Sequence, residues 1–162
     1  MNQRSDPIAF FITWTVYGTF LQGDSRWWRK KGAGSQAPQP RLEAWHRDRL
    51  VYEVILLDFE HRQIVQFEVS THCERRGWKL WAMAARTNHV HIVVSAPRFT
   101  GKKVRDQLKA NCTRGIRQID SRFTDRPVWT TNGDIEFIDS EWDLCVVTEY
   151  VNDAQDRMHL GK

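Results

Sequence analysis

The stretch that decides the fold is WKLWAMAARTNHVHIVVS, residues 78–95. It holds two strand-like runs, residues 78–86 and 89–95, which are separated only by Thr87 and Asn88. A connection of two residues between two such runs is typical of a tight antiparallel hairpin. The sequence therefore predicts a hairpin in the middle of the chain, and the second strand of this hairpin is the most apolar segment of the protein.

The segments before the hairpin predict a strand, a loop and a helix. Residues 8–16 are rich in Phe, Ile, Trp, Thr and Val, which suit a pleated, half-buried strand. Residues 23–40 are polar and basic, and their glycines and prolines interrupt any regular pattern, so we expect a mobile basic loop. After a patch at residues 42–57 that could include a short helix, Asp58 can cap a helix that runs to about Arg76, where Gly77 supplies the stop.

The segments after the hairpin predict a helix, a strand and a final helix. In residues 101–119 apolar side chains recur at helical spacing while the other faces are basic, which indicates a basic amphipathic helix. Residues 128–138 predict one strand, or a short hairpin about Asn132 and Gly133. Ser140 and Asp143 then have the spacing of a capping box, which predicts a last helix to about Met158.

The order of these elements indicates the fold class. A strand, a helix, two strands, a helix, a strand and a helix match the split βαβ arrangement, so we expect an α+β, ferredoxin-like antiparallel sheet with the helices packed on one face. At 162 residues the chain is near the usual size of one domain. We therefore expect a single domain over residues 1–162, with a basic loop or insertion at residues 22–41.

The composition is that of a folded protein. Hydrophobic residues make up 41% and charged residues 27% of the chain, which excludes a wholly disordered protein. No apolar run approaches the ~20 residues needed to cross a bilayer, and residues 1–6 lack the pattern of a signal peptide. The sequence predicts a cytoplasmic protein with no membrane partner.

Charge and cysteines narrow the class of partner only slightly. The net charge of +4 leans toward an anionic partner, although the charge of a whole chain is weak evidence. Cys73, Cys112 and Cys145 are widely spaced and odd in number, so they fit neither a disulfide framework nor a zinc site. We expect them to be reduced.

Two histidines on the second hairpin strand could share a metal ion. Successive side chains of a strand alternate faces, so His89 and His91 project from one side with Cα atoms ~6.6 Å apart, while Val90 faces the core. Both imidazoles could then reach one ion. The alternative is that two histidines merely share a sheet face, which is the more common reading of a His-x-His pattern by itself.

The residues around this pair resemble a known family. Residues 88–94, NHVHIVV, resemble the Asn-His-Val-His-aliphatic signature of the single-tyrosine, His-hydrophobic-His transposases, namely the insertion-sequence-200-like and REP-associated tyrosine transposases. The resemblance extends to the basic helix from about residue 102, to residues 126–129 (RPVW) and to the helix that bears Tyr150. It covers about residues 78–156.

The resemblance implies an activity and a nucleophile. It implies a ferredoxin-like, metal-dependent endonuclease and strand transferase that acts on single-stranded DNA, at hairpin-containing ends, through a transient 5′-phosphotyrosine. Tyr150 is the expected nucleophile, since Tyr17 ends the first strand and Tyr52 lies before the motif. A neutral phenol is a weak nucleophile at pH 7, so it gains from a metal ion that polarises the phosphate. The alternative for Tyr150 is a structural role, packing beside the sheet.

The metal site has one uncertain ligand. The resemblance favours Mg²⁺ or Mn²⁺ held by His89 and His91, and relatives add a polar side chain about one turn after the tyrosine. Here that position is Ala154, which departs from the family pattern. Asp153 shares a helix face with Tyr150, and Gln155 has the amide chemistry but lies about 140° around the helix, so both remain candidates.

DNA contacts are expected from cations and aromatic side chains. Cations on the basic helix would neutralise phosphates without reading sequence, although a merely solvated face is the alternative. The tryptophans at 27 and 28 could stack on unpaired bases, whereas those at 14, 78, 81 and 142 are expected to fill cores. The candidate DNA-binding residues are Lys102, Lys103, Arg105, Lys109, Arg114 and Arg117.

Three functional hypotheses follow from the sequence. The first is the transposase-like endonuclease, with single-stranded or hairpin DNA as partner and with a homodimer or a monomer as the active form. The second is a replication-initiator or relaxase-like nickase, although relaxases that begin with their tyrosine have the opposite order of motifs. The third is a non-catalytic nucleic-acid-binding module on the same scaffold, which the departure at Ala154 keeps open.

Overall fold

A four-stranded antiparallel sheet forms the centre of the protein. The structure is a computed structural model that describes residues 6–26, 28–30 and 33–160. The strands lie in the order β4-β5-β1-β6, and each is antiparallel to its neighbours. Their bounds are β1 (Ala9–Thr15), β4 (Lys79–Ala85), β5 (His89–Ser95) and β6 (Asp134–Ile138).

The connections between the strands give the ferredoxin-like topology. Helix α2 (Phe59–Arg76) leads from β1 towards β4, and helix α3 (Gly101–Ile119) leads from β5 towards β6. In the sheet, β5 lies between β1 and β4, and β1 lies between β5 and β6. Each strand–helix–strand unit therefore has a strand of the other unit inserted in it, as in a split βαβ fold. The predicted α+β fold with an antiparallel sheet is confirmed.

The central hairpin and the two crossing helices follow their local sequence signals. The backbone N–H of Arg86 donates to the carbonyl of His89 at 2.8 Å, which closes the hairpin over Thr87 and Asn88. Asp58 caps α2 by accepting from the His61 N–H at 2.9 Å. Gly77 ends α2 with a φ of 71°, a left-handed conformation that glycine adopts without strain. Helix α3 has the predicted bounds.

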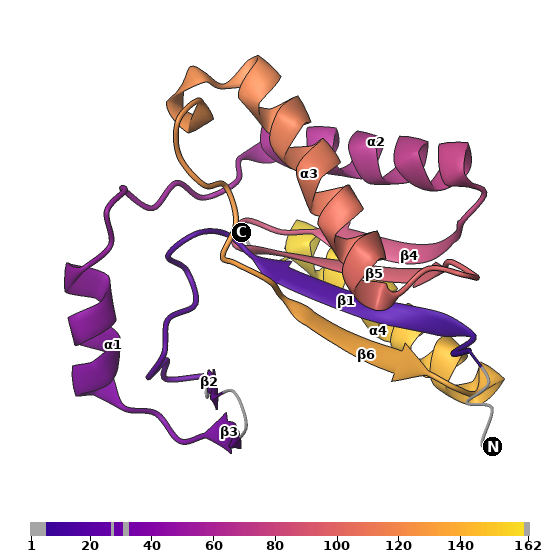
Figure 1. The fold of residues 1–162 in the computed structure, drawn as a ribbon, viewed down its shortest axis with the longest axis horizontal. Helices are drawn as coiled ribbons and strands as arrows, with labels where there is room; N and C mark the ends of the chain where they lie inside the picture. The colour runs from indigo at the N-terminus through magenta and orange to yellow at the C-terminus, as the bar shows by residue number, and fades with distance from the viewer. Residues whose placement is uncertain (1–5, 27, 31–32, 161–162) are drawn as a thin grey trace.

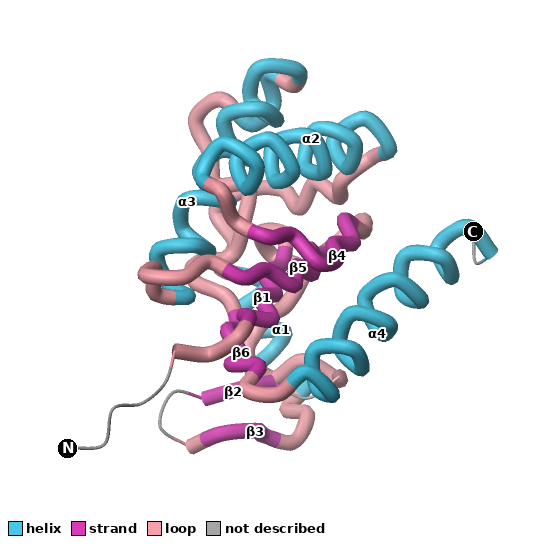
Figure 2. The backbone as a smooth tube through the Cα atoms, turned by 90° about the vertical axis from the view of Figure 1, so that its right-hand side faces the viewer, coloured by secondary structure: helices cyan, strands magenta, loops and turns pink. Residues whose placement is uncertain are grey.

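The two faces of the sheet are covered by different helices. Helices α2 and α3 bury one face over a core that includes Ile12, Trp14 and Ile92, all within 1% of full burial. The other face is covered by α4 (Glu141–Leu160), where Val93 and Val151 are fully buried. Figure 2 shows the sheet between the α2 and α3 pair and α4. The expectation of helices on one face therefore holds for α2 and α3 but not for α4.

Strand β5 explains why both faces need a cover. Ile92 and Val93 point to opposite sides of the sheet, and both have no exposed surface. A strand that is apolar on both faces must be packed on both, as in sheets buried between two layers. On the α4 side, the small side chains of Ala82 and Ala84 let the apolar stripe of α4 approach closely.

The segment between β1 and α2 contains a short hairpin where a basic loop was expected, and it contains a short helix that overlaps the one allowed for in residues 42–57. Strand β2 (Trp28–Lys30) pairs antiparallel with β3 (Gly34–Gln36), and helix α1 (Pro40–Asp48) follows. Pro40 lies in the first turn of α1, where its missing N–H costs nothing. Figure 1 shows this segment to one side of the sheet, beside the end where β1 finishes and β6 begins.

Two of the four tryptophans that were predicted to fill the core are exposed. Trp14 and Trp78 are buried as expected, but the side chains of Trp81 and Trp142 are 41% and 77% exposed, so the core prediction was wrong for them. The pairing of β4 with β5 shifts between Leu80 and Ala82, and this irregularity leaves Trp81 outside, where its indole N–H donates to Ser95. Trp142 lies in the first turn of α4, away from the apolar stripe of that helix.

The remaining expectations concern thiols and membranes. Cys73, Cys112 and Cys145 are all free thiols, as predicted. Within the described residues, no helix is long and apolar enough to cross a membrane.

Candidate functional site

The two histidines of β5 lie side by side on the face covered by α4. Their ring centroids are 4.5 Å apart. The Nδ1 atom of His89 lies 2.7 Å from Oδ1 of Asn88, and the Nδ1 atom of His91 lies 2.8 Å from Oγ1 of Thr13. A partner on Nδ1 fixes the orientation of an imidazole and leaves Nε2 as the nitrogen for a metal ion. In both rings, Nε2 is therefore the nitrogen left for a metal ion.

The electrostatic surroundings keep both imidazoles neutral. Burial is the largest cause that lowers the pKa of each histidine to about 4, and the positive charge of Arg86 adds to it. The pKa of His89 is lowered further by His91 and by Arg26. At pH 7 both side chains are in the neutral form that binds metal ions.

Thr13 orients His91 from the neighbouring strand, because β1 pairs Thr13 directly with His91. We expect Thr13→Val, which keeps the shape but removes the hydroxyl, to weaken Mn²⁺ binding about 10-fold, since the ring loses the partner of its Nδ1 atom. Isothermal titration calorimetry measures the affinity. The matched control is Thr131→Val at an exposed position, and equal affinities for both variants would contradict the prediction.

Tyr150 reaches the same place from the C-terminal helix. Its ring centroid lies 6.0 Å from that of His91, and its side chain is 56% exposed. Phe11 stacks on His91 at 5.4 Å with the ring planes 29° apart, and its edge meets Tyr150 at 6.4 Å. As predicted, Tyr150 lies on the flank of α4, exposed and with its ring beside His91.

The position of Tyr150 depends on how α4 is anchored. Ser140 caps α4 by accepting from the Asp143 N–H at 3.1 Å, as predicted. Next to Tyr150, Val151 is fully buried against the sheet, with Leu144 and Val147 half-buried on the same stripe. One buried valine therefore anchors the turn of helix that carries the tyrosine.

We expect Val151→Asp to detach this turn of α4 and to lower the rate of DNA cleavage about 100-fold, because a displacement of about 1 Å of a reacting group has that effect. The core under α2 and α3 is untouched, so the thermal midpoint should fall much less than for a core variant. Hydrogen exchange of the α4 amides would show the detachment. The control is Val146→Asp, because Val146 lies on the same helix and is 48% exposed. This variant should cleave DNA at the normal rate. Equal rates for the two variants would contradict the prediction.

The identity of the third metal ligand stays a prediction. Over residues 6–26, 28–30 and 33–160, no three His, Cys, Asp or Glu side chains lie close enough together to hold a metal ion, and Asp153 is exposed. Gln155 belongs to α4, but its side chain lies outside the described part of the chain. The donor set among the described side chains is thus two neutral imidazoles, which fits a divalent ion that takes further ligands from phosphate and water.

The basic helix lies on the opposite face of the sheet from the histidines. Half of its candidate DNA-binding cations are engaged with backbone carbonyls. Arg105 is 6% exposed and donates to Gly133, Lys109 donates to Thr130 and Asn132 at 2.9 and 2.7 Å, and Arg117 donates to Phe123 and Arg126 at 2.9 and 3.0 Å. These bonds hold the chain between α3 and β6 in place, and DNA contact by the three cations stays a prediction.

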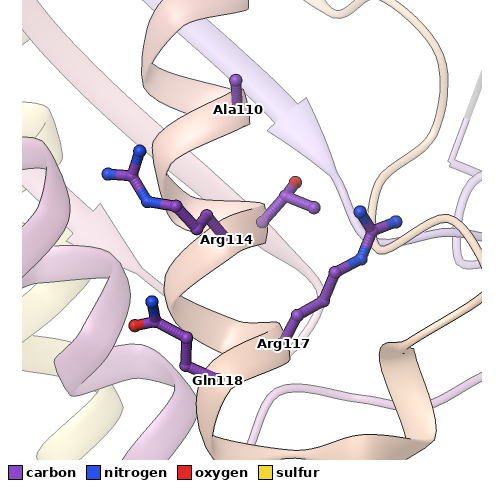
Figure 3. A pocket seen from close by; sticks show the side chains of 5 residues that line it. Ala110, Arg114, Arg117 and Gln118 are labelled. Carbon is purple, nitrogen blue, oxygen red and sulfur yellow. The ribbon is translucent and has the colours of Figure 1, made fainter.

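The exposed cations of α3 are Lys102, Lys103, Arg114 and Arg117, and of these Arg117 also donates to backbone carbonyls. Arg114 and Arg117 border a shallow pocket of about 440 Å³, which Figure 3 shows along the outer side of α3 together with Ala110 and Gln118. DNA binding by these cations stays a prediction. The tryptophan at position 27 and the side chain of the one at position 28 lie outside the described residues, so base stacking by them also stays a prediction.

A cleft that the sequence did not predict adjoins the histidines. It measures about 540 Å³ and runs between the β1 and β6 end of the sheet and the segment that carries β2 and β3. Thr13 and Thr15 form part of its floor, and in the sheet they pair with His91 and His89. Arg26 and Phe20 line it from the other side. The alternation of Thr13 and Thr15 was readable in the sequence, but the pairing that brings them to the histidines was not.

Comparison with known proteins places the fold. No family model matches this sequence, and no curated protein matches it. Among solved structures, a candidate transposase from Deinococcus radiodurans R1 superposes with a TM-score of 0.51 at 11% identity, covering 94% of this chain and 95% of that one. A REP-associated tyrosine transposase bound to a REP hairpin superposes with a TM-score of 0.53 at 11% identity, covering 91% of this chain and 66% of that one. This chain has the fold of the tyrosine transposases.

The tyrosine transposase fold agrees with the resemblance in residues 88–94. The match to the Deinococcus radiodurans protein extends over nearly the whole of both chains, so the segment between β1 and α2 falls within the aligned length. At 11% identity, the superposition shows a shared arrangement of strands and helices.

Proposed function

We propose that this protein is a metal-dependent single-stranded DNA endonuclease and strand transferase that cleaves DNA through a 5′-phosphotyrosine on Tyr150. The observation that carries the proposal is the meeting of Tyr150 with His89 and His91 on one face of the sheet. The tyrosine arrives on α4 and the histidines on β5, and the ring of Tyr150 lies 6.0 Å from that of His91. A tyrosine beside two oriented, neutral imidazoles suits phosphoryl transfer better than a structural role.

The chemistry is a pair of transesterifications. Bound Mg²⁺ or Mn²⁺ would polarise the phosphate and offset its developing charge. The Oη atom of Tyr150 loses its proton and forms a bond to phosphorus, the bond from phosphorus to O3′ breaks, and O3′ takes a proton and leaves as a hydroxyl. Attack by a second 3′-hydroxyl then reverses this step, joins the DNA strands and returns the phenol.

The proposed substrate is single-stranded DNA with a hairpin beside the cleavage site. A protein with the same fold is bound to a REP hairpin, and we extend that class of ligand to this chain. The third metal ligand is proposed to come from the end of α4, with Asp153 and Gln155 as the candidates. The homodimer and the cytoplasmic location remain predictions from the sequence.

The direct test is to trap the protein–DNA bond. Hairpin DNA labelled at its 3′ end is incubated with the protein and Mn²⁺, or with EDTA as control, and denaturing gels reveal a labelled protein band. Peptide mapping of that band then identifies the modified residue, which we expect to be Tyr150. Binding of DNA without any adduct across a broad panel of hairpins would favour the non-catalytic module. An adduct that is never resolved by a second 3′-hydroxyl would favour the nickase.

A further inference from the structure

The cleft beside the histidines has a mixed chemical surface. Its floor carries the hydroxyls of Thr13, Thr15 and Thr130, and the Thr15 hydroxyl donates to that of Thr130 at 2.8 Å. Phe20 and Arg26 line it from the segment after β1. The volume of about 540 Å³ is within the range of pockets that hold a small organic ligand, ~300–1,000 Å³.

Arg26 is fixed in place at this cleft. Its Nε and Nη2 atoms donate to Asp24 at 2.8 and 2.7 Å, and Nη2 also donates to the carbonyl of Thr19 at 2.8 Å. Asp24 is only 6% exposed, whereas the Arg26 side chain is 54% exposed. A buried carboxylate that accepts two hydrogen bonds from an exposed guanidinium orients the cation. The cation also stays accessible to a phosphate.

Phe20 supplies a flat apolar surface next to this cation. Its ring centroid lies 5.3 Å from the guanidinium carbon of Arg26, and its side chain is half-buried. Unpaired bases stack on such rings whatever their identity, because every base has a π-face. A ring for a base and an adjacent cation for a phosphate are the two elements that recognise a nucleotide in a single strand.

We propose that this cleft is a subsite for one unpaired nucleotide of the DNA strand that flanks the scissile phosphate, with Phe20 stacking on its base and Arg26 contacting its phosphate. The subsite rests on the proposed function for its position relative to the cut. Its floor residue Thr13 is hydrogen-bonded to His91, so a nucleotide in the cleft is adjacent to the phosphate that lies at the histidine pair. The segment between β1 and α2 would thus select single-stranded DNA next to the hairpin.

The test measures binding without cleavage. A Tyr150→Phe background in EDTA is titrated, by fluorescence anisotropy, with a fluorescein-labelled DNA hairpin that carries a short single-stranded tail, and with the same hairpin without a tail. Phe20→Leu and Arg26→Gln should each raise the Kd for the tailed hairpin about 5- to 50-fold, as expected for a lost stacking or phosphate contact. The Kd for the tailless hairpin should change less than about twofold.

Matched controls are available on the other face of the protein. Phe59→Leu removes an exposed ring and Arg75→Gln an exposed cation, both on α2, and both should leave the Kd unchanged. Because Arg26→Gln leaves Asp24 without its partner, the thermal midpoint is measured, and if that variant unfolds, Phe20→Leu decides. As a second readout, 2-aminopurine placed in the tail should be quenched on binding to the parent but not to Phe20→Leu.

The outcomes separate the subsite from the catalytic proposal. Equal losses for the tailed and tailless hairpins, or no change in a folded Phe20→Leu variant, would overturn the subsite even if DNA cleavage is observed. A tail-specific loss in a protein that never forms an adduct would support the subsite and remove the catalytic role of Tyr150. Failure of the parent to bind any tailed hairpin would overturn the subsite as well.

Discussion

Tyr150→Phe is expected to abolish the covalent protein–DNA adduct and to lower the rate of strand cleavage by about 10⁴-fold or more, the range seen when a nucleophile is removed. The substitution deletes one oxygen and keeps the ring. The edge contact with Phe11 and the contact with His91 are made by that ring, so the structure around it should persist. Affinity for hairpin DNA should change less than about twofold, because an exposed hydroxyl contributes little to binding.

The control for this prediction is Tyr52→Phe. Tyr52 is also partly exposed, at 39%, and it packs on Tyr17 in the segment before α2, away from the histidines. Gel analysis of the adduct, with the cleavage rate measured by quenched-flow sampling, compares the two variants with the parent. An adduct in Tyr150→Phe at the parental rate would remove Tyr150 from its role, and an equal loss in both variants would point to a general fault in folding.

The sequence predicted those elements whose signals are local. The central hairpin, α2 and α3 were placed to within a residue or two. Their determinants are a two-residue turn, a capping aspartate at 58, a left-handed glycine at 77 and helical spacing in residues 101–119. Each of these signals acts within a few residues, so no knowledge of the tertiary structure is needed to read it.

The errors concern contacts between distant segments. That Ile92 and Val93 are both buried shows that β5 needs a layer on each face, but the sequence does not say which helix supplies the second one. Likewise, Arg105 and Lys109 donate hydrogen bonds to carbonyls in residues 130–133, and the spacing of basic residues in α3 gives no sign of these partners. Partners of this kind are set by packing and cannot be read from periodicity.

The candidate site also divides into features that local sequence predicts and features that depend on contacts between distant segments. His89 and His91 share a face because strands alternate, and this needed only the strand assignment. The arrival of Tyr150 was inferred from the family resemblance, and the structure brings its ring to His91. The contact of Thr13 with His91 depends on the pairing of β1 with β5, and the cleft lined by Arg26 depends on how the segment after β1 meets the chain around residues 130–134. Local sequence contains no signal for either arrangement.

His91→Ala is expected to lower Mn²⁺-dependent cleavage about 10²- to 10³-fold and to reduce Mn²⁺ affinity by a similar factor. The reason is that one remaining imidazole cannot hold the ion in place, and metal assistance contributes several kcal/mol at about 1.4 kcal/mol per tenfold in rate. Calorimetric titration with Mn²⁺ and the gel assay measure the two effects. His46→Ala, at a half-buried histidine of α1 that is hydrogen-bonded to Gln22, is the control and should bind and cleave normally.

We expect His89 and His91 to act as one unit. This expectation distinguishes a shared metal site from a structural role in which the histidines only pack against their neighbours. His91 also contacts the rings of Phe11 and Tyr150, so His91→Ala could act by moving α4. His89 meets His91 at 4.5 Å and is held by Asn88, so His89→Ala leaves the ring contacts of Tyr150 in place. If both histidines hold the metal ion, each single variant and the double variant lose nearly the same activity. If His89→Ala binds Mn²⁺ and cleaves DNA as the parent does, the histidine pair is not a metal site. If the losses of the two single variants multiply in the double variant, each histidine acts independently.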